Sequence, residues 1–199
     1  KDAAFFGKNT KILPTCLNLK EYQSKQIYLR HVRSIVFSGN LNYFPNVDAI
    51  LFFYKIFKKL KKSYPEVKFS IAGNGWNSKL DKLKSDSSVI FLGEVENMNQ
   101  TLMQADLAVC PMNLASGMQN KVIEAMVAGV PSVISFKAKG GLNLISETHC
   151  MIAKNETEFL QHVLTLMNNH DLRKKLAKNA RTYIENNHSL DRLSKDIFD

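Results

Sequence analysis

The sequence predicts an α/β protein with a Rossmann-like, doubly wound parallel sheet and helices on both faces. Short apolar runs rich in β-branched residues alternate with stretches in which apolar residues recur every three or four positions. A glycine or a proline follows most of the apolar runs, as expected at the end of a strand. The 199 residues are 45% hydrophobic and 23% charged, which is typical of a folded domain.

The first two elements show both signals. Ser34–Ser38 is apolar at its centre and ends at Gly39, which predicts a buried strand. Pro45 fits the first turn of a helix, and Pro65 stops that helix. The apolar side chains between the two prolines have helical spacing: Val47, Ile50, Leu51, Tyr54, Phe57 and Leu60.

The same alternation continues to the end of the chain. Gly129 closes one of the later helices, and Ser189 is placed to cap the last one. In chain order, the predicted strands cover residues 34–38, 67–72, 89–92, 107–110, 131–136 and 150–153. The predicted helices cover residues 46–64, 78–84, 96–105, 120–128, 156–168, 171–186 and 190–198.

We divide the chain into three parts. Residues 1–30 are polar, irregular and broken by Pro14, so they are expected to be a linker and the remnant of a preceding domain. Residues 31–186 form the Rossmann-like domain, and 187–199 form a terminal helix that can cross back to the missing domain. The chain begins at Lys1 and not at a methionine, so we expect a fragment of a longer protein.

The charge balance favours anionic partners, because 27 lysines and arginines against 18 acidic residues give a formal net charge of +9. No aromatic-and-basic motif of a nucleic-acid-binding module is present, so no nucleic-acid partner is expected. An anionic membrane surface is the other option. The lysines that would contact such a membrane form a basic cluster on the first helix. The same cluster is equally well explained as a solvated helix face. Its members are Lys55, Lys58, Lys59, Lys61 and Lys62.

The three cysteines are far apart and suggest neither a disulfide framework nor a zinc site. No signal peptide and no run of about 18 apolar residues is visible. We therefore expect a cytoplasmic protein, with a peripheral position on the inner face of the membrane as an option.

Ligands of a doubly wound sheet bind beyond the carboxyl ends of its strands, which draws attention to the loop at Gly73–Gly75. Glycines here allow a phosphate to approach the backbone. A dinucleotide fingerprint needs a third glycine, and Ser78 stands in that place. A nicotinamide-dependent dehydrogenase is therefore only a weak alternative, and a tight strand-to-helix turn explains the glycines equally well.

The segment from residue 111 to residue 131 carries more information. Gly117 lies in a loop, and Asn120 and Lys121 open the helix that follows, where free amides and a lysine favour an anion. Glu124 is three positions after Lys121, so both side chains lie near one face of the helix. The pair suits a diphosphate and the hydroxyls of a ribose. The alternative is an exposed pair of opposite charges, worth only about 0.2–0.5 kcal/mol.

This segment resembles the donor-site motif of retaining GT-B glycosyltransferases of the large family 4 type. In that motif, a Glu-Ala-Met-Ala-x-Gly-x-Pro stretch follows a glycine loop. Other pieces occur in the family's order and extend the resemblance from about Thr10 to Phe198: residues 11–14, 37–41, 45–49, 73–75 and 91–93. The stretches 45–49 and 117–122 are similar to sugar transferases of envelope or exopolysaccharide pathways.

The resemblance implies a role for each matching residue. Glu124 would bind the nucleotide ribose, and Lys121 would stabilise the diphosphate. Asn40 would stand near the donor phosphates. Gly73 and Gly75 fall in the family's order and are counted among the substrate-binding residues, with the phosphate role that their loop suggests on its own. Gly93 and Glu94 would sit beside the base. The diphosphate and the sugar would be lined by Ser116, Gly117, Met118, Gln119, Asn120 and Lys121. No metal and no cofactor is expected, since the nucleotide-sugar donor is a substrate.

The implied function is the donor-binding domain of a retaining glycosyltransferase that moves a sugar from a nucleotide-sugar to an acceptor hydroxyl. Its pathway would be cell-envelope or exopolysaccharide synthesis. The sequence departs from the family where a first glutamate is usual, because Ser116 stands there. The acceptor domain, which precedes this one in the family, is missing, so this fragment is expected to be inactive alone. The alternative is a non-catalytic, degenerate transferase domain that acts as an assembly or membrane-surface module.

Overall fold

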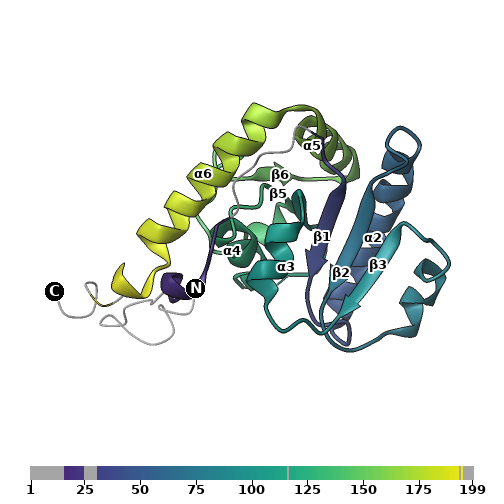
Figure 1. Ribbon diagram of the computed structural model, residues 1–199, viewed down its shortest axis with the longest axis horizontal. Coiled ribbons are helices and arrows are strands. Elements are labelled where there is room, and N and C mark those ends of the chain that lie inside the picture. Colours follow the sequence, from purple (N-terminus) through teal and green to yellow (C-terminus); the bar gives the residue numbers. More distant parts are fainter. Residues whose placement is uncertain (1–15, 25–30, 116, 193, 195–199) are drawn as a thin grey trace.

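The computed structural model describes residues 16–24, 31–115, 117–192 and 194 of the chain (Figure 1). Six parallel strands form one sheet in the order β3-β2-β1-β4-β5-β6. The predicted α/β class and the doubly wound parallel sheet are confirmed. The strands are β1 (Ser34–Ser38), β2 (Lys68–Ala72), β3 (Val89–Gly93), β4 (Leu107–Cys110), β5 (Ser132–Ser135) and β6 (Met151–Ala153).

The helices lie where the amphipathic stretches of the sequence are. The α-helices are α2 (Phe44–Lys61), α3 (Met98–Gln104), α4 (Asn120–Val127), α5 (Glu156–Asn168) and α6 (His170–Asn187). Short 3₁₀ helices are η1 (Leu19–Glu21), η2 (Ser78–Leu83) and η3 (Lys137–Lys139). The 3₁₀ helices η1 and η3 were not predicted.

Two helices differ from their predicted limits by two residues or more. Helix α2 ends at Lys61 instead of Tyr64, because the residue before a proline is disfavoured in a helix and the last turn loosens before Pro65. Helix α3 begins at Met98 instead of Glu96. The side chain of Asn97 accepts a hydrogen bond from the Gln100 amide at 3.0 Å and fixes the start of α3 there.

Alternating side chains of the strands supply two cores. On one face, an aromatic cluster joins α2 and α5 to the sheet, with ring centroids of Phe53 and Phe69 4.9 Å apart and those of Phe53 and Phe159 5.9 Å apart. On the opposite face, Val36 and Ala108 pack against small residues of α4 such as Ala125. Small side chains let the α4 backbone approach the sheet closely. Helix α4 carries Lys121 and Glu124, so this packing places both residues near the strand ends.

The strand order reverses between β1 and β4. Strand β1 pairs with β2 on one side and with β4 on the other, with Ile35 opposite Phe69 and Leu107. The chain then leaves β1 for α2 on one face and leaves β4 for α4 on the other. In open α/β sheets, this switch point opens a crevice at the carboxyl ends of the strands.

Helix α6 packs against α4 and fixes its far end (Figure 1). Nη1 of Arg181 donates a hydrogen bond to the Val127 carbonyl at 2.6 Å, at the carboxyl end of α4 where cations are favoured. Gly129 closes α4 with a φ of 70°, as predicted from the sequence. These two contacts fix the carboxyl end of α4 and therefore the direction in which its amino end points.

The two ends of the described chain lie side by side (Figure 1). The Leu17 amide donates to the His188 carbonyl at 2.7 Å, and the Leu190 amide donates to the Leu17 carbonyl at 3.1 Å. Residues 190–192 are helical, as predicted for the terminal helix, whereas most of 193–199 and of the predicted linker lie outside the described residues. The three-part division of the chain stays a prediction. Among the described helices, none combines the length and the apolar character needed to span a bilayer.

Candidate functional site

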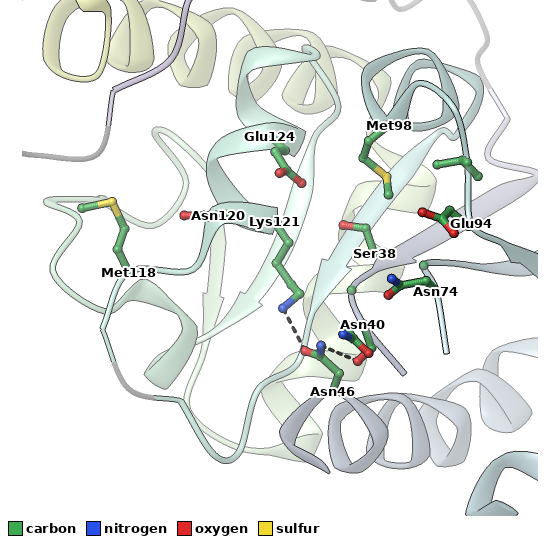
Figure 2. Close-up of a pocket in the computed structure, with 13 residues that line it drawn as sticks. Ser38, Asn40, Asn46, Asn74, Glu94, Met98, Met118, Asn120, Lys121 and Glu124 are labelled. Carbon is green, nitrogen blue, oxygen red and sulfur yellow. Dashed lines mark hydrogen bonds between the residues drawn. The ribbon is translucent and has the colours of Figure 1, made fainter. Parts of the chain in front are cut away.

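A pocket of about 480 Å³ lies at the switch point, between the carboxyl ends of β1 and β2 and the start of α4 (Figure 2). It is open to solvent and mixed in character, with charged, amide and thioether side chains around it. Its lining residues are Ser38, Gly39, Asn40, Asn46, Gly73, Asn74, Glu94, Val95, Met98, Met118, Asn120, Lys121 and Glu124.

Two glycines bring the loops after β1 and β2 into direct backbone contact. A Cβ built on Gly73 would lie 2.0 Å from the Gly39 carbonyl oxygen, and Gly73 has a φ of 146°. The loops are tied further by the Gly39 amide, which donates to the Ala72 carbonyl at 2.9 Å, and by the Leu41 amide, which donates to the Asn74 carbonyl at 2.8 Å. The Cβ positions of Gly39 and Gly73 therefore point at neighbouring protein atoms, and the two loops form one closely packed wall of the pocket, to which Asn40 and Asn74 also belong.

The opposite wall is the first turn and a half of α4. The helix begins without a hydrogen bond from a side-chain cap. Its first amides therefore leave a partial positive charge at the edge of the pocket, beside Asn120. Such a helix start favours a phosphate or another anion.

Lys121 adds a full positive charge to this wall (Figure 2). Its Nζ donates a hydrogen bond to Oδ1 of Asn46 at 2.9 Å, and Nδ2 of Asn46 donates to the Asn40 carbonyl at 2.9 Å. The ammonium also lies 5.5 Å from the centroid of the Phe37 ring. The lysine is therefore held toward the β1 loop, on the floor of the pocket.

Glu124 lies one turn further into α4 and faces the same pocket as Lys121 (Figure 2). Burial raises the pKa of its carboxyl group above the ordinary value of 4.5, and the nearby charge of Lys121 opposes part of that rise. Hydrogen bonds from a ligand's hydroxyl groups would stabilise such a half-buried carboxylate beside an open pocket.

The structure brings seven of the predicted site residues together around this pocket. They are Asn40, Gly73, Glu94, Met118, Asn120, Lys121 and Glu124. Four others do not line it: Gly75, Gly93, Gly117 and Gln119. Gly75 packs against the Asn42 side chain instead, and the Gly93 carbonyl accepts a hydrogen bond from the Gly73 amide at 2.8 Å. Ser116 lies outside the described residues. The roles assigned to all these residues stay predictions.

Sequence reasoning missed six lining residues: Ser38, Gly39, Asn46, Asn74, Val95 and Met98. Most of them lie at or just after the end of a strand, in loops that the rule on strand ends already selects, but the rule does not say which residues of a loop line the pocket. Asn46 has a different signal, because it is a polar residue only 4% exposed at the start of an otherwise apolar helical face.

A second pocket of about 300 Å³ lies on the same edge of the sheet, between α2 and α5. It is more apolar, with Phe52, Phe136 and Phe159 among its lining residues.

His149 lines neither of the two pockets. Its Nδ1 accepts a hydrogen bond from the Ile145 amide at 3.0 Å, and its ring lies 4.9 Å from that of Tyr183. In the described ranges, no three His, Cys, Asp or Glu side chains gather as metal ligands would.

The fold and the pocket define a doubly wound α/β domain with an open, partly charged cleft at its switch point. The chain belongs to the family Glycosyl transferases group 1, whose sequence profile matches residues 32–169. The match covers β1 through α5 and therefore every residue that lines the cleft.

One curated relative and two solved structures illustrate the similarity. The relative is an uncharacterized 44.6 kDa protein in the cps region of Klebsiella pneumoniae, 25% identical over 84% of this chain and 46% of its own length. The structure of S. aureus TarM, a G117R mutant in complex with fondaparinux, alpha-GlcNAc-glycerol and UDP, has a TM-score of 0.77 and 16% identity. It covers 98% of this chain and 40% of that one.

Anabaena HepE in complex with UDP and glucose has a TM-score of 0.73 and 15% identity, over 94% of this chain and 55% of that one. At these identities, the structures establish a shared fold. The present chain spans less than half the length of the Klebsiella relative and of TarM.

Proposed function

We propose that this chain is the donor-binding domain of a retaining glycosyltransferase and that the pocket at the switch point binds a nucleotide-sugar. The observation that carries the proposal is the placing of Lys121, Glu124 and the start of α4 around one open pocket of about 480 Å³. The glycosyltransferase family and the UDP named in the TarM and HepE structures support this ligand class.

The diphosphate of the donor lies against the start of α4. There, the first amides of the helix and the ammonium of Lys121 supply positive charge, and Asn120 lies beside them. The closely packed loops of Gly39 and Gly73 border the other side of the pocket.

The ribose lies beside Glu124, which accepts hydrogen bonds from its hydroxyl groups. Such charge-assisted bonds require the carboxylate form, and ligand hydroxyls replace part of the hydration that burial removes. The base lies further along the pocket, where Glu94 and Val95 follow β3 and Met98 begins α3. A thioether and a valine suit the flat, apolar faces of a base.

In the proposed reaction, the bond from the anomeric carbon to the diphosphate oxygen breaks, and an acceptor hydroxyl forms the new bond on the same face of the sugar. The departing diphosphate gains negative charge. The amides of α4 and Lys121 are already oriented toward that charge, so they stabilise the transition state more than the ground state. We propose that these groups act without a metal ion or a cofactor.

The acceptor side of the site belongs to the missing amino-terminal domain in this proposal, so this chain binds a donor and does not turn over alone. The pathway is cell-envelope or exopolysaccharide synthesis, supported by the relative in a cps region. The site of action is the cytoplasm or the inner face of the membrane.

Isothermal titration of the chain with UDP, GDP and ADP tests the donor site. We expect one of the three to bind, and Glu124→Ala to weaken its binding about 10- to 100-fold, the loss of one or two hydrogen bonds to a charged group. Glu66→Ala is the control, because Glu66 is exposed and distant from the pocket lining. No binding of any of the three diphosphates would contradict the proposal.

The second candidate is a non-catalytic module that assembles on a membrane surface. It is favoured by the exposed lysines that α2 presents to solvent, among them Lys55, Lys58 and Lys62. A module of this kind binds anionic vesicles and takes no nucleotide, so the titration above separates the two candidates.

A further inference from the structure

Asn46 is a buried polar side chain whose hydrogen bonds reach beyond its own helix. It is 4% exposed and lies in the first turn of α2. Its Oδ1 accepts from Nζ of Lys121 at 2.9 Å, and its Nδ2 donates to the Asn40 carbonyl at 2.9 Å. One amide group therefore links α2, the loop after β1 and the start of α4, which are the three parts of the pocket floor (Figure 2).

Helix capping does not explain this side chain. Tyr43 is the N-cap residue of α2, and Asn46 lies within the helix, with its own amide bonded to the Tyr43 carbonyl at 2.9 Å. Both polar atoms of the Asn46 side chain bond to groups outside α2. The local needs of the helix would be met equally well by an apolar residue.

The space around Asn46 is closely matched to its size. A Cβ built on Gly39 would lie 2.7 Å from Nδ2 of Asn46, so the glycine loop packs directly on the amide. A longer side chain at position 46 would push the loop outward. The short amide and the glycine therefore fit together as one unit.

The amide fixes the lysine without cancelling its charge. An aspartate in the place of Asn46 would form an ion pair with Lys121 and remove the positive potential from the pocket. An asparagine oxygen accepts the same hydrogen bond and leaves the ammonium with its full charge. The ring of Phe37, 5.5 Å away, adds a second contact that also leaves the charge in place.

We propose that Asn46 is a positioning residue that holds the Lys121 ammonium in place for the diphosphate of a bound nucleotide. This inference rests on the donor site proposed above. Holding the long lysine side chain in advance reduces the conformational entropy that binding would otherwise cost. Because Asn46 acts through Lys121, its effect is expected to be largest on ligands that carry phosphates.

The test compares Asn46→Ala, Asn46→Asp, Lys121→Met and the double variant Asn46→Ala/Lys121→Met. Asn99→Ala is the matched control. Asn99 is also a buried asparagine, 7% exposed, and its side chain bonds to the Gln23 backbone at 3.0 and 3.1 Å. It therefore reports what the loss of a buried bridging amide does at a residue that does not itself line the pocket.

Titration with UDP and with uridine separates positioning from general damage to the fold. We expect Asn46→Ala to weaken UDP binding about tenfold, a loss of about 1.4 kcal/mol, and uridine binding less than about twofold. Asn46→Asp weakens UDP binding more than Asn46→Ala does, because it also neutralises Lys121. In the Lys121→Met background, Asn46→Ala has little further effect. Equal losses for UDP and uridine, or additive losses in the double variant, would overturn the proposal.

A second measurement is independent of nucleotides. Acetic anhydride labelling with mass-spectrometric readout compares the rate at Lys121 with that at Lys137, whose Nζ donates to the Asn113 carbonyl at 2.8 Å. We expect Asn46→Ala to raise the Lys121 rate several-fold and leave Lys137 unchanged, whereas Asn99→Ala changes neither rate. An unchanged Lys121 rate overturns the role of Asn46. A raised rate in a chain that binds no diphosphate supports the anchoring of Lys121 and overturns the donor site.

Discussion

At the scale of single residues, the most informative group is the carboxyl of Glu124. Desolvation by burial raises its pKa, with Lys121 acting in the opposite direction. A carboxyl group whose pKa is raised in the folded state lowers the stability of the fold once pH rises above that pKa. The arrangement is understandable if the missing hydrogen bonds come from a ligand, which is how binding sites commonly trade stability for function.

The substitution Glu124→Gln tests whether the Glu124 carboxylate lowers the stability of the fold. The folded-state pKa is raised above the unfolded value near 4.5, so the folded form holds its proton to higher pH, and stability falls as pH rises through the folded-state pKa. Below pH 4.5 the group is neutral in both states. We therefore expect Glu124→Gln to raise the thermal midpoint at pH 7 and to lose this advantage in acid, as measured by circular dichroism melts between pH 4 and pH 7.

The same substitution removes a charged acceptor and should weaken nucleotide binding while the domain becomes more stable. Glu66→Gln is the control, since its exposed carboxyl group has no burial to relieve. A midpoint that falls at pH 7 would show that the protein itself stabilises the Glu124 carboxylate, and a gain that persists well below pH 4.5 would show that it does not come from removing the buried charge.

Sequence reasoning reached Glu124 and Lys121 but not Asn46, and the reason is physical. Lys121 and Glu124 share one helix face, so their proximity follows from a spacing of three residues. Asn46 and Lys121 are 75 positions apart and meet only because β1 and β4 are neighbours in the sheet. Local pattern carries no information on that contact. The resemblance to a family assigned roles to Gly93 and Gln119, but neither residue lines the pocket. Whether a residue lines it depends on the path of its loop, which a sequence motif does not specify.

At the scale of elements, the wall of the pocket depends on the backbone contact between the loops after β1 and β2. The closeness of Gly39 and Gly73 leaves no room for a side chain. The sequence showed a glycine loop but left open whether it formed a tight turn or a phosphate site. The observed contact explains why the residue is glycine on steric grounds alone, whatever the ligand.

Gly73→Ala is expected to destabilise the domain by about 2–4 kcal/mol, because the new Cβ would meet the Gly39 carbonyl at 2.0 Å and the φ of 146° is strained for alanine. Urea unfolding measures the change. Gly141→Ala is the control, since its Cβ would meet nothing within 4 Å, and we expect a change below about 0.5 kcal/mol. Equal effects at both positions would refute the steric explanation.

Helix α2 carries the lysine cluster, and several lysines of the cluster interact with other groups of the protein. Lys59 pairs with Glu156 at 2.6 Å, and Lys61 donates to the Pro65 and Val67 carbonyls. Nζ of Lys58 lies 5.2 Å from the centroid of the Tyr54 ring. The basic face is therefore partly structural, which weakens the case for a dedicated membrane surface.

Co-sedimentation with vesicles rich in phosphatidylserine measures what remains of that case. If α2 docks on a membrane, Lys55→Gln/Lys58→Gln/Lys62→Gln lowers binding by about 1 kcal/mol per lysine at low salt. Because these lysines lie outside the pocket lining, UDP binding is expected to stay unchanged in the same variant. Binding that is insensitive both to salt and to the three substitutions would rule out a membrane role for this face.

At the scale of the whole molecule, the fold was predictable from the sequence. All six strands were predicted within about two residues, because each is a short apolar run bounded by loop residues. Their order also follows the usual doubly wound arrangement. In the function proposed above, an acceptor domain would close over the open side of the pocket.

We expect the isolated chain to bind its nucleotide without transferring or hydrolysing the sugar. UDP at about 100 times its dissociation constant would stabilise the fold by about 2.7 kcal/mol, measured by thermal shift. Incubation with UDP-glucose or UDP-N-acetylglucosamine, followed by chromatography of the free sugar, is expected to show no release above the background without protein. Turnover by the 199-residue chain would contradict the division of labour proposed here.

The hydrogen bonds between Leu17 and the backbone at His188 and Leu190 make the chain enter and leave the domain at one point. The bridge between Leu17 and Ser189 is parallel, so force applied at the two ends would load its two hydrogen bonds together, in shear, before tension reached the six-stranded sheet. In a single-molecule pulling experiment, the domain would therefore yield in two steps, a weak early extension at the junction and a later, stronger rupture of the core.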